Sequence, residues 1–168
     1  MYWELFALAF LCFSYHTAIH VLEHLRRIPE IKAVFISIGL CMLLGWVSYF
    51  YISFSGLELS LSLMNYAGLA LLLVGFYLFF VSHAKVHKRM HSGKGGLVTE
   101  GIYRHIRHPM YLGEILMLLG APLFGGSSLT LMLSPLFIVQ ILVWRYMEEK
   151  ELLKEFPGYA AYKKKTLF

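Results

Sequence analysis

Residues 61–81, LSLMNYAGLALLLVGFYLFFV, are an apolar run without a charged side chain. A helix needs about 20 apolar residues to cross the hydrocarbon core of a bilayer, so this run predicts a membrane-spanning helix. The composition agrees, because 58% of the 168 residues are hydrophobic and 15% are charged, whereas a soluble domain has about 25% charged residues. An aromatic content of 16% excludes a disordered chain. The fold class that remains is an all-α integral membrane protein.

Four more apolar stretches predict about five transmembrane helices in total. They cover about residues 3–25, 31–54, 109–124 and 129–144. Glycine and serine at 125–128 (GGSS) separate the last two, which we expect to form a tight helical hairpin. The short first arm of this hairpin fits either a full crossing or a half-inserted helix.

We expect a single membrane domain over residues 1–168. Residues 1–82 would hold three N-terminal spans, and residues 83–168 would hold a cytoplasmic connector, the hairpin and a cytoplasmic C-terminal helix. The start of the sequence lacks the basic region of a cleaved signal peptide, so we expect the first span to be retained.

The positive charges predict the orientation. All 15 Lys and Arg residues fall before the second span, between the third and fourth, or at and after the end of the fifth. With five spans these places share one side, which the positive-inside rule assigns to the cytoplasm, leaving the N-terminus outside. The membrane would be the plasma (inner) membrane of a prokaryote or the endoplasmic reticulum of a eukaryote. The net charge of +5 thus reports topology, and no nucleic-acid partner follows from it.

The segment before the fourth span has a different character. Residues 93–113 read GKGGLVTEGIYRHIRHPMYLG, and the glycines allow the backbone to bend closely around a ligand. They match neither the dinucleotide fingerprint nor a Walker A loop. Pro109 suits the first turn of a helix, which places His108 near the N-cap beside the positive end of the helix dipole. Arg, His and Tyr also favour the membrane surface, so an interfacial belt is the structural alternative.

A second polar group follows the fifth span. Arg145 and Glu149 are four residues apart, on one face of a helix. Because a hairpin returns the end of the fifth span to the start of the fourth, we expect His108 and Tyr111 to face these two residues. The alternative is an ordinary ion pair on a solvated helix.

Together these elements resemble the isoprenylcysteine carboxyl methyltransferase and phospholipid methyltransferase superfamily of membrane enzymes. The resemblance covers roughly the last 75 residues, from about Gly93 to Thr166. The matching elements are Leu97-Val98-x-x-Gly101-x-Tyr103, Arg107-His108-Pro109-x-Tyr111, Arg145-x-x-x-Glu149 and Phe156…Tyr159…Tyr162.

The resemblance implies methyl transfer from S-adenosyl-L-methionine at the cytoplasmic face. The partner would be a lipid or lipidated acceptor, with a prenylcysteine-like carboxylate favoured over a phospholipid amine, a quinone-like lipid or a small thiol. Arg145 would contact the acceptor carboxylate, and no metal ion is implied. The residues that would bind the cofactor are Gly95, Gly96, Leu97, Val98, Tyr103, His108, Pro109, Met110, Tyr111 and Glu149.

The chemistry suits the edge of a membrane. An anion that attacks a sulfonium cation neutralises both charges, so a low dielectric favours the reaction. A carboxylate acceptor needs no general base, and Arg145 could hold it by paired hydrogen bonds. An amine acceptor would need deprotonation, for which His108 and Glu114 are the catalytic candidates.

Two histidine rows support a rival hypothesis. His16, His20 and His24 repeat every four residues, as do His83, His87 and His91. Such rows build metal and haem sites on helices, which suggests a membrane metalloprotein. The sequence has no adjacent His-His pair of the kind that di-iron membrane enzymes carry, so packing is the favoured role for both rows. A small scaffold or transporter-like protein would leave the motif order unexplained.

A third alternative lies near the same family. Membrane sterol reductases share an Arg-His-Pro-x-Tyr-x-Gly-Glu pattern and use NADPH, and here Glu114 follows Gly113. Met110 stands where those proteins usually have Asn. This residue and the short chain favour the methyltransferase.

Overall fold

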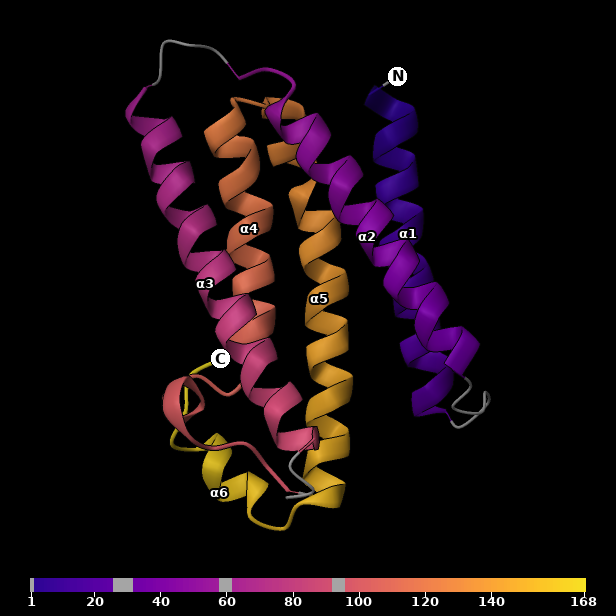
Figure 1. Ribbon diagram of the computed structural model, residues 1–168, viewed down its shortest axis with the longest axis vertical. Helices are drawn as coiled ribbons and strands as arrows, with labels where there is room; N and C mark the ends of the chain where they lie inside the picture. Colours follow the sequence, from indigo (N-terminus) through magenta and orange to yellow (C-terminus); the bar gives the residue numbers. More distant parts are fainter. Residues whose placement is uncertain (1, 26–31, 58–61, 92–95) are drawn as a thin grey trace.

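Six α-helices and one 3₁₀ helix occur among the residues described by the structure, a computed structural model (Figure 1). The described residues are 2–25, 32–57, 62–91 and 96–168. They contain no β-strand, which confirms the all-α fold class. The helices are α1 (Tyr2–His24), α2 (Lys32–Phe54), α3 (Leu63–His91), α4 (Pro109–Gly125), α5 (Ser128–Glu155) and α6 (Tyr159–Lys163), with the 3₁₀ helix η1 at Gly101–Arg104.

The helix lengths make this an integral membrane protein. Four helices, namely α1, α2, α3 and α5, are long and apolar enough to cross a bilayer. The helix α4 has 17 residues, or about 26 Å at 1.5 Å per residue, close to the thickness of the hydrocarbon core. It forms the predicted hairpin with α5. Gly126 ends α4 in the left-handed conformation (φ 70°), and the Ser127 side chain accepts a hydrogen bond from the backbone N–H of Thr130 to cap α5.

Two predicted helix ends differ from the structure. The helix α3 continues past residue 82 to His91, and α5 continues past Trp144 to Glu155. Residues 83–91 contain Ala, Lys, Arg and Met, and residues 145–155 are rich in Glu, Lys and Leu. All of these have high helix propensity, so leaving the apolar layer does not end either helix. The expected C-terminal helix is therefore mostly the end of α5, with α6 as a separate helix of five residues.

Small residues bring α3 and α4 into close contact. A side chain built at Gly113 of α4 would place its Cβ 2.6 Å from the carbonyl oxygen of Gly75 in α3, so nothing larger than glycine fits without a shift. Such close approach is a common way of packing helices in membranes, where apolar burial does not drive association. The contact fixes the start of α4, where the motif residues lie.

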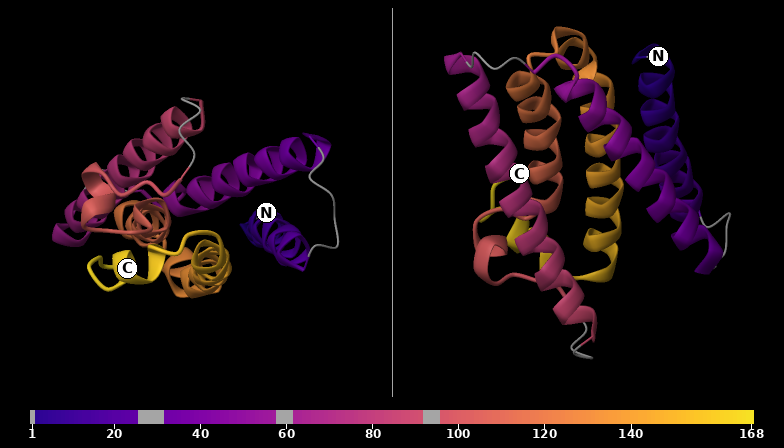
Figure 2. Two further views of the ribbon diagram at one scale, coloured as in Figure 1. Left: turned by 90° about the horizontal axis from the view of Figure 1, so that it is seen from below. Right: turned by 45° about the horizontal axis from the view of Figure 1, so that its top comes forward.

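Aromatic rings join α1 and α2 to the hairpin. The buried ring of Phe13 lies 5.0 Å from that of Phe137, centroid to centroid, and 5.8 Å from that of Trp144. Tyr49 of α2 donates a hydrogen bond of 2.6 Å to the carbonyl oxygen of Leu118 in α4. The first two helices thus pack against the hairpin (Figures 1 and 2).

The polar ends of the helices gather at one end of the bundle. The end of α1, the start of α2, the end of α3, the start of α4 and the end of α5 all lie at the bottom of Figure 1. The C-terminal segment, yellow in Figure 2, lies against this end of α4 and α5. This arrangement agrees with the expected grouping of the charges, while the assignment of this end to the cytoplasm remains a prediction.

Candidate active site

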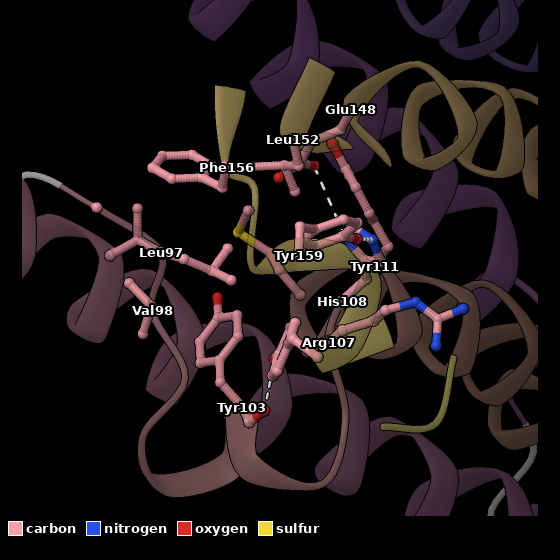
Figure 3. Close-up of a pocket in the computed structure, with 14 residues that line it drawn as sticks. Leu97, Val98, Tyr103, Arg107, His108, Tyr111, Glu148, Leu152, Phe156 and Tyr159 are labelled. Carbon is pink, nitrogen blue, oxygen red and sulfur yellow. Dashed lines mark hydrogen bonds and ion pairs between the residues drawn. The ribbon is translucent and has the colours of Figure 1, made fainter. Parts of the chain in front are cut away.

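A pocket opens where the ends of α3, α4 and α5 meet the segment 96–108 and α6 (Figure 3). Its wall combines apolar side chains with several tyrosines and few charged groups. The lining residues are Val86, Gly96, Leu97, Val98, Tyr103, Arg107, His108, Met110, Tyr111, Glu148, Leu152, Phe156, Tyr159 and Tyr162.

Most of the cofactor residues expected from the sequence meet at this pocket. Seven of the ten line it, namely Gly96, Leu97, Val98, Tyr103, His108, Met110 and Tyr111. Pro109 is buried behind them as the first residue of α4. Glu149 lies beside the pocket without lining it, and Gly95 lies outside the described residues.

A turn at Gly101 shapes the polar side of the pocket. Gly101 has a positive φ of 63° and begins η1, which turns Tyr103 inward. The phenol of Tyr103 is buried, which raises its pKa to about 12 and keeps it protonated near neutral pH. Tyr162 of α6 donates a hydrogen bond of 2.5 Å to the Tyr103 carbonyl oxygen and so fastens α6 to this turn.

His108 occupies the predicted N-cap of α4 and is 4% exposed. Its Nε2 atom lies 3.2 Å from the hydroxyl of Tyr159 and 3.4 Å from Oε1 of Glu149. Burial lowers the pKa of His108 to about 4, although the charge of Glu149 acts in the opposite direction. The imidazole is therefore neutral at pH 7 and well placed to orient its neighbours by hydrogen bonds.

Glu149 is the centre of an ion network. Its Oε1 atom accepts a hydrogen bond of 2.7 Å from Nε of Arg107 and lies 3.4 Å from Nη2 of Arg145. Its other oxygen pairs with Lys163 of α6. The ion pair of Arg145 with Glu149, which was the alternative interpretation of the sequence, is thus present. Because these cations occupy the carboxylate, Glu149 joins α5 to α6 and to the segment that precedes α4, beside the pocket.

Glu148, which the sequence interpretation passed over, supplies the carboxylate that lines the pocket. Its side chain is 41% exposed and forms a hydrogen bond with the hydroxyl of Tyr111. Successive helix residues point about 100° apart, so two neighbouring glutamates cannot both face the same side. In the sequence, the adjacent pair Glu148-Glu149 indicates that a glutamate lies at the pocket. The motif alone does not show which of the two faces the cavity.

The pocket includes other residues that were not predicted as site residues. Three of them belong to the motifs quoted above, namely Arg107, Tyr159 and Tyr162. Their positions in these motifs could have identified them as pocket residues. Val86 and Leu152 belong to the helix extensions of α3 and α5 that the predicted spans did not include.

Arg145 does not line the pocket. Its Nε atom is buried without a hydrogen-bond partner among the described residues. The ring of Phe168 covers its guanidinium, with 4.3 Å between Cζ and the ring centroid. In this arrangement an aromatic ring covers the guanidinium.

The first histidine row packs between α1 and α5. His16 and His20 lie against Trp144, with ring centroids 4.3 Å and 6.3 Å apart, and His24 contacts Glu151 at 3.0 Å. In the second row His83 stacks on Phe79 at 6.1 Å. The side chain of His91 lies outside the described part of the chain.

Metal ligation has no geometric support in the described part of the chain. No group of three or more His, Cys, Asp or Glu residues is arranged there to hold a metal ion.

Comparison with known proteins places these observations in a family. The profile of the family described as "Protein of unknown function (DUF1295)" matches residues 14–166. A curated relative is the Protein-S-isoprenylcysteine O-methyltransferase of Schizosaccharomyces pombe, 35% identical over 72 residues. That alignment covers 42% of this chain and 30% of the yeast protein. No solved structure gives a significant match. The predicted resemblance to the methyltransferase superfamily is thus confirmed.

Proposed function

The chain belongs to the DUF1295 family, and we propose that it transfers a methyl group from S-adenosylmethionine to a lipid-linked acceptor at the membrane surface. The acceptor group that we favour is a prenylcysteine-like carboxylate. The observation that carries the proposal is the pocket itself, in which a carboxylate, Glu148, stands among tyrosines and apolar side chains.

The composition of this pocket fits the methyl donor. S-adenosylmethionine combines a flat aromatic base, ribose hydroxyls, an ammonium group and a sulfonium. Leu97, Val98 and Phe156 offer apolar contacts to the base, and tyrosine faces attract cations. Glu148 can accept hydrogen bonds from the ammonium or from the ribose hydroxyls.

When bound, S-adenosylmethionine supplies an electrophilic methyl group on a positively charged sulfur. Tyr103, Tyr111 and the neutral His108 orient the donor and exclude water from its reactive end. An acceptor carboxylate attacks without prior loss of a proton, so the mechanism needs no general base. As the new oxygen–carbon bond forms, the sulfur–carbon bond breaks and the sulfur keeps the electron pair.

Arg145 is our candidate for holding the acceptor carboxylate. It lies on the same helix as Glu148, less than one turn before it, so both reactants would meet at the end of α5. Its planar guanidinium suits bidentate binding of a carboxylate. A lipid tail could remain in the bilayer while the head group reaches this end of the bundle. We place this end at the cytoplasmic face, on the basis of the positive charges.

Binding of S-adenosylhomocysteine to the purified protein tests the donor site. Isothermal titration calorimetry should give saturable binding to the wild type and a loss of at least about tenfold in affinity for Glu148→Gln, since a charged hydrogen bond contributes about 1.5–3 kcal/mol. The exposed Glu155→Gln, on the same helix, is the matched control and should bind like the wild type. Absence of binding, or equal affinity in all three proteins, would contradict the proposed donor site.

The acceptor requires a second measurement. Membranes that contain the protein are incubated with isotope-labelled S-adenosylmethionine and N-acetyl-S-farnesylcysteine, and the products are identified by mass spectrometry. We expect a labelled methyl ester of the farnesylcysteine. If another membrane lipid is labelled and the farnesylcysteine is not, the proposed methyl transfer stands but the proposed acceptor is wrong.

A further inference from the structure

The strap, which we define as residues Thr166–Phe168, runs beside the segment that precedes α4. The backbone N–H of Leu167 donates to the carbonyl oxygen of His105 at 2.8 Å, and the N–H of Arg107 donates to that of Leu167 at 3.0 Å. The Arg107 side chain also donates to the Thr166 carbonyl oxygen at 2.8 Å. These bonds form a short parallel bridge between Ile106 and Leu167. The first two residues of the strap are therefore well anchored.

Phe168 extends from this anchor over Arg145. The distance of 4.3 Å from the guanidinium carbon to the ring centroid is that of a cation–π contact. Phe168 has a φ of 50°, in the left-handed region that an aromatic residue rarely adopts. The half-buried ring thus contacts Arg145 from a backbone conformation that is unfavourable for Phe.

The guanidinium below this ring has unused hydrogen-bonding capacity. Arginine carries five N–H donors. Here Nη2 reaches Glu149 only at 3.4 Å, and Nε is buried with no acceptor within the described residues. A buried polar atom without a partner in a folded protein calls for an explanation, such as a functional role or a bound water or ion. An aromatic ring cannot accept these hydrogen bonds in the plane of the guanidinium, whereas a carboxylate can.

We propose that Phe168 is a gate on an acceptor site at Arg145, and that its ring must leave the guanidinium before the acceptor carboxylate can bind. The inference rests on the proposed function, because it takes the acceptor to be an anion. The strap then acts as a competitor of the acceptor. Binding selects the fraction of molecules with the ring displaced, so the apparent affinity is reduced in proportion to that fraction. Phe168 would therefore limit which head groups reach the end of α5, without contacting the methyl donor.

Chemical labelling of Arg145 tests the gate independently of catalysis. The full-length protein in detergent is treated with phenylglyoxal, which modifies accessible guanidinium groups, and the rate at each arginine is followed by peptide mass spectrometry. A cation–π contact is worth about 0.5–1 kcal/mol, so Phe168→Ala should label at Arg145 about two- to fivefold faster than wild type. The exposed Arg104 serves as the internal reference.

Leu167→Ala is the matched control, because Leu167 is 73% exposed and its substitution retains the backbone bridge. It should label at the wild-type rate. Equal rates at Arg145 in Phe168→Ala and wild type would overturn the proposal. Unchanged affinity for S-adenosylhomocysteine shows that each variant is folded, and this measurement makes a failure of the gate distinguishable from a failure of the donor site.

Kinetics then test the role of the gate in acceptor binding. With N-acetyl-S-farnesylcysteine as the acceptor, Phe168→Ala should lower KM about two- to fivefold at unchanged affinity for S-adenosylhomocysteine. An unchanged or raised KM would contradict the gate even if Arg145 becomes more accessible. If no methyl transfer to this acceptor is found, the proposed acceptor fails and the labelling experiment still decides whether Phe168 covers Arg145.

Discussion

Glu148 and Glu149 are consecutive residues of α5, yet only Glu148 lines the pocket, where it bonds to Tyr111. Glu149 instead binds Arg107 and Lys163 beside it. The two glutamates therefore differ in role: Glu148 is placed to contact a ligand, and Glu149 stabilises the fold through ion pairs. This difference makes the pair a direct test of the site.

Glu149→Gln should destabilise the protein more than it weakens donor binding. The substitution leaves Arg107 and Lys163 without their anion, and breaking a largely buried ion pair costs about 3–5 kcal/mol. Thermal unfolding in detergent should show a clear fall in Tm, whereas Glu148→Gln should keep a near wild-type Tm and lose affinity for S-adenosylhomocysteine. The reverse pattern would place Glu149 in the donor site.

Tyr111→Phe should weaken donor binding to a smaller extent. It removes the hydroxyl that bonds to Glu148 and preserves the ring that lines the pocket. A hydrogen bond contributes about 1 kcal/mol, so the Kd for S-adenosylhomocysteine should rise about fivefold in calorimetry. Tyr146→Phe, at an exposed position of α5, should leave the Kd unchanged. A loss as large as that of Glu148→Gln would mean that the hydroxyl contacts the ligand itself.

Gly113→Ala should disturb the contact between α3 and α4. Its new Cβ would lie 2.6 Å from the carbonyl oxygen of Gly75, a rigid backbone atom. Overpacking of this kind costs about 1–3 kcal/mol, and it should lower both Tm and donor affinity because α4 carries His108 and Tyr111. Gly39→Ala is the control, since a Cβ there meets nothing within 4 Å. Equal Tm values for the two variants would contradict the close packing.

Stability should fall on acidification through His108. Its pKa is about 4 in the folded protein and about 6.5 in an unfolded chain. Between these two pH values the unfolded state binds the proton more readily than the folded state. The stabilisation that comes from keeping His108 neutral is therefore fully present above pH 6.5 and is lost as the pH falls towards 4. Over this range the free energy of unfolding changes by up to about 1.4 kcal/mol per pH unit. The Tm should be followed from pH 7 to pH 4.5 in wild type and in His108→Asn. The variant should lose less stability over this range, and parallel curves would exclude His108 as the source.

The sequence alone allowed the apolar helices to be predicted, and it indicated that the motifs lie close together. Hydrophobic run lengths located the five apolar helices, and the GGSS link between α4 and α5 indicated the hairpin. A hairpin brings the two ends of its arms together, so His108 and Glu149 could be placed side by side before any coordinates were known. These conclusions depend only on helix geometry and on the order of the elements.

Helix rotation and long-range contacts could not be predicted in this way. Which of Glu148 and Glu149 faces the cavity depends on how α5 is rotated against α4, and this rotation is set by packing along the whole hairpin. The contact of Phe168 with Arg145 joins residues that no periodic pattern relates. The extension of α5 beyond Trp144 was missed because the span prediction followed hydrophobicity, whereas helix propensity continues to Glu155.

The bonds of Arg107 also constrain the order of events during biosynthesis. This residue joins Glu149 of α5 and Thr166 of the strap, and both are synthesised after the pocket residues from Val86 to Tyr111. Nascent chains released before residue 149 would carry the glycine-containing segment and α4 without the carboxylate that fixes them. A cell should therefore contain no donor-binding form of a truncated chain, and incomplete products would be open to proteolysis at this end of the bundle.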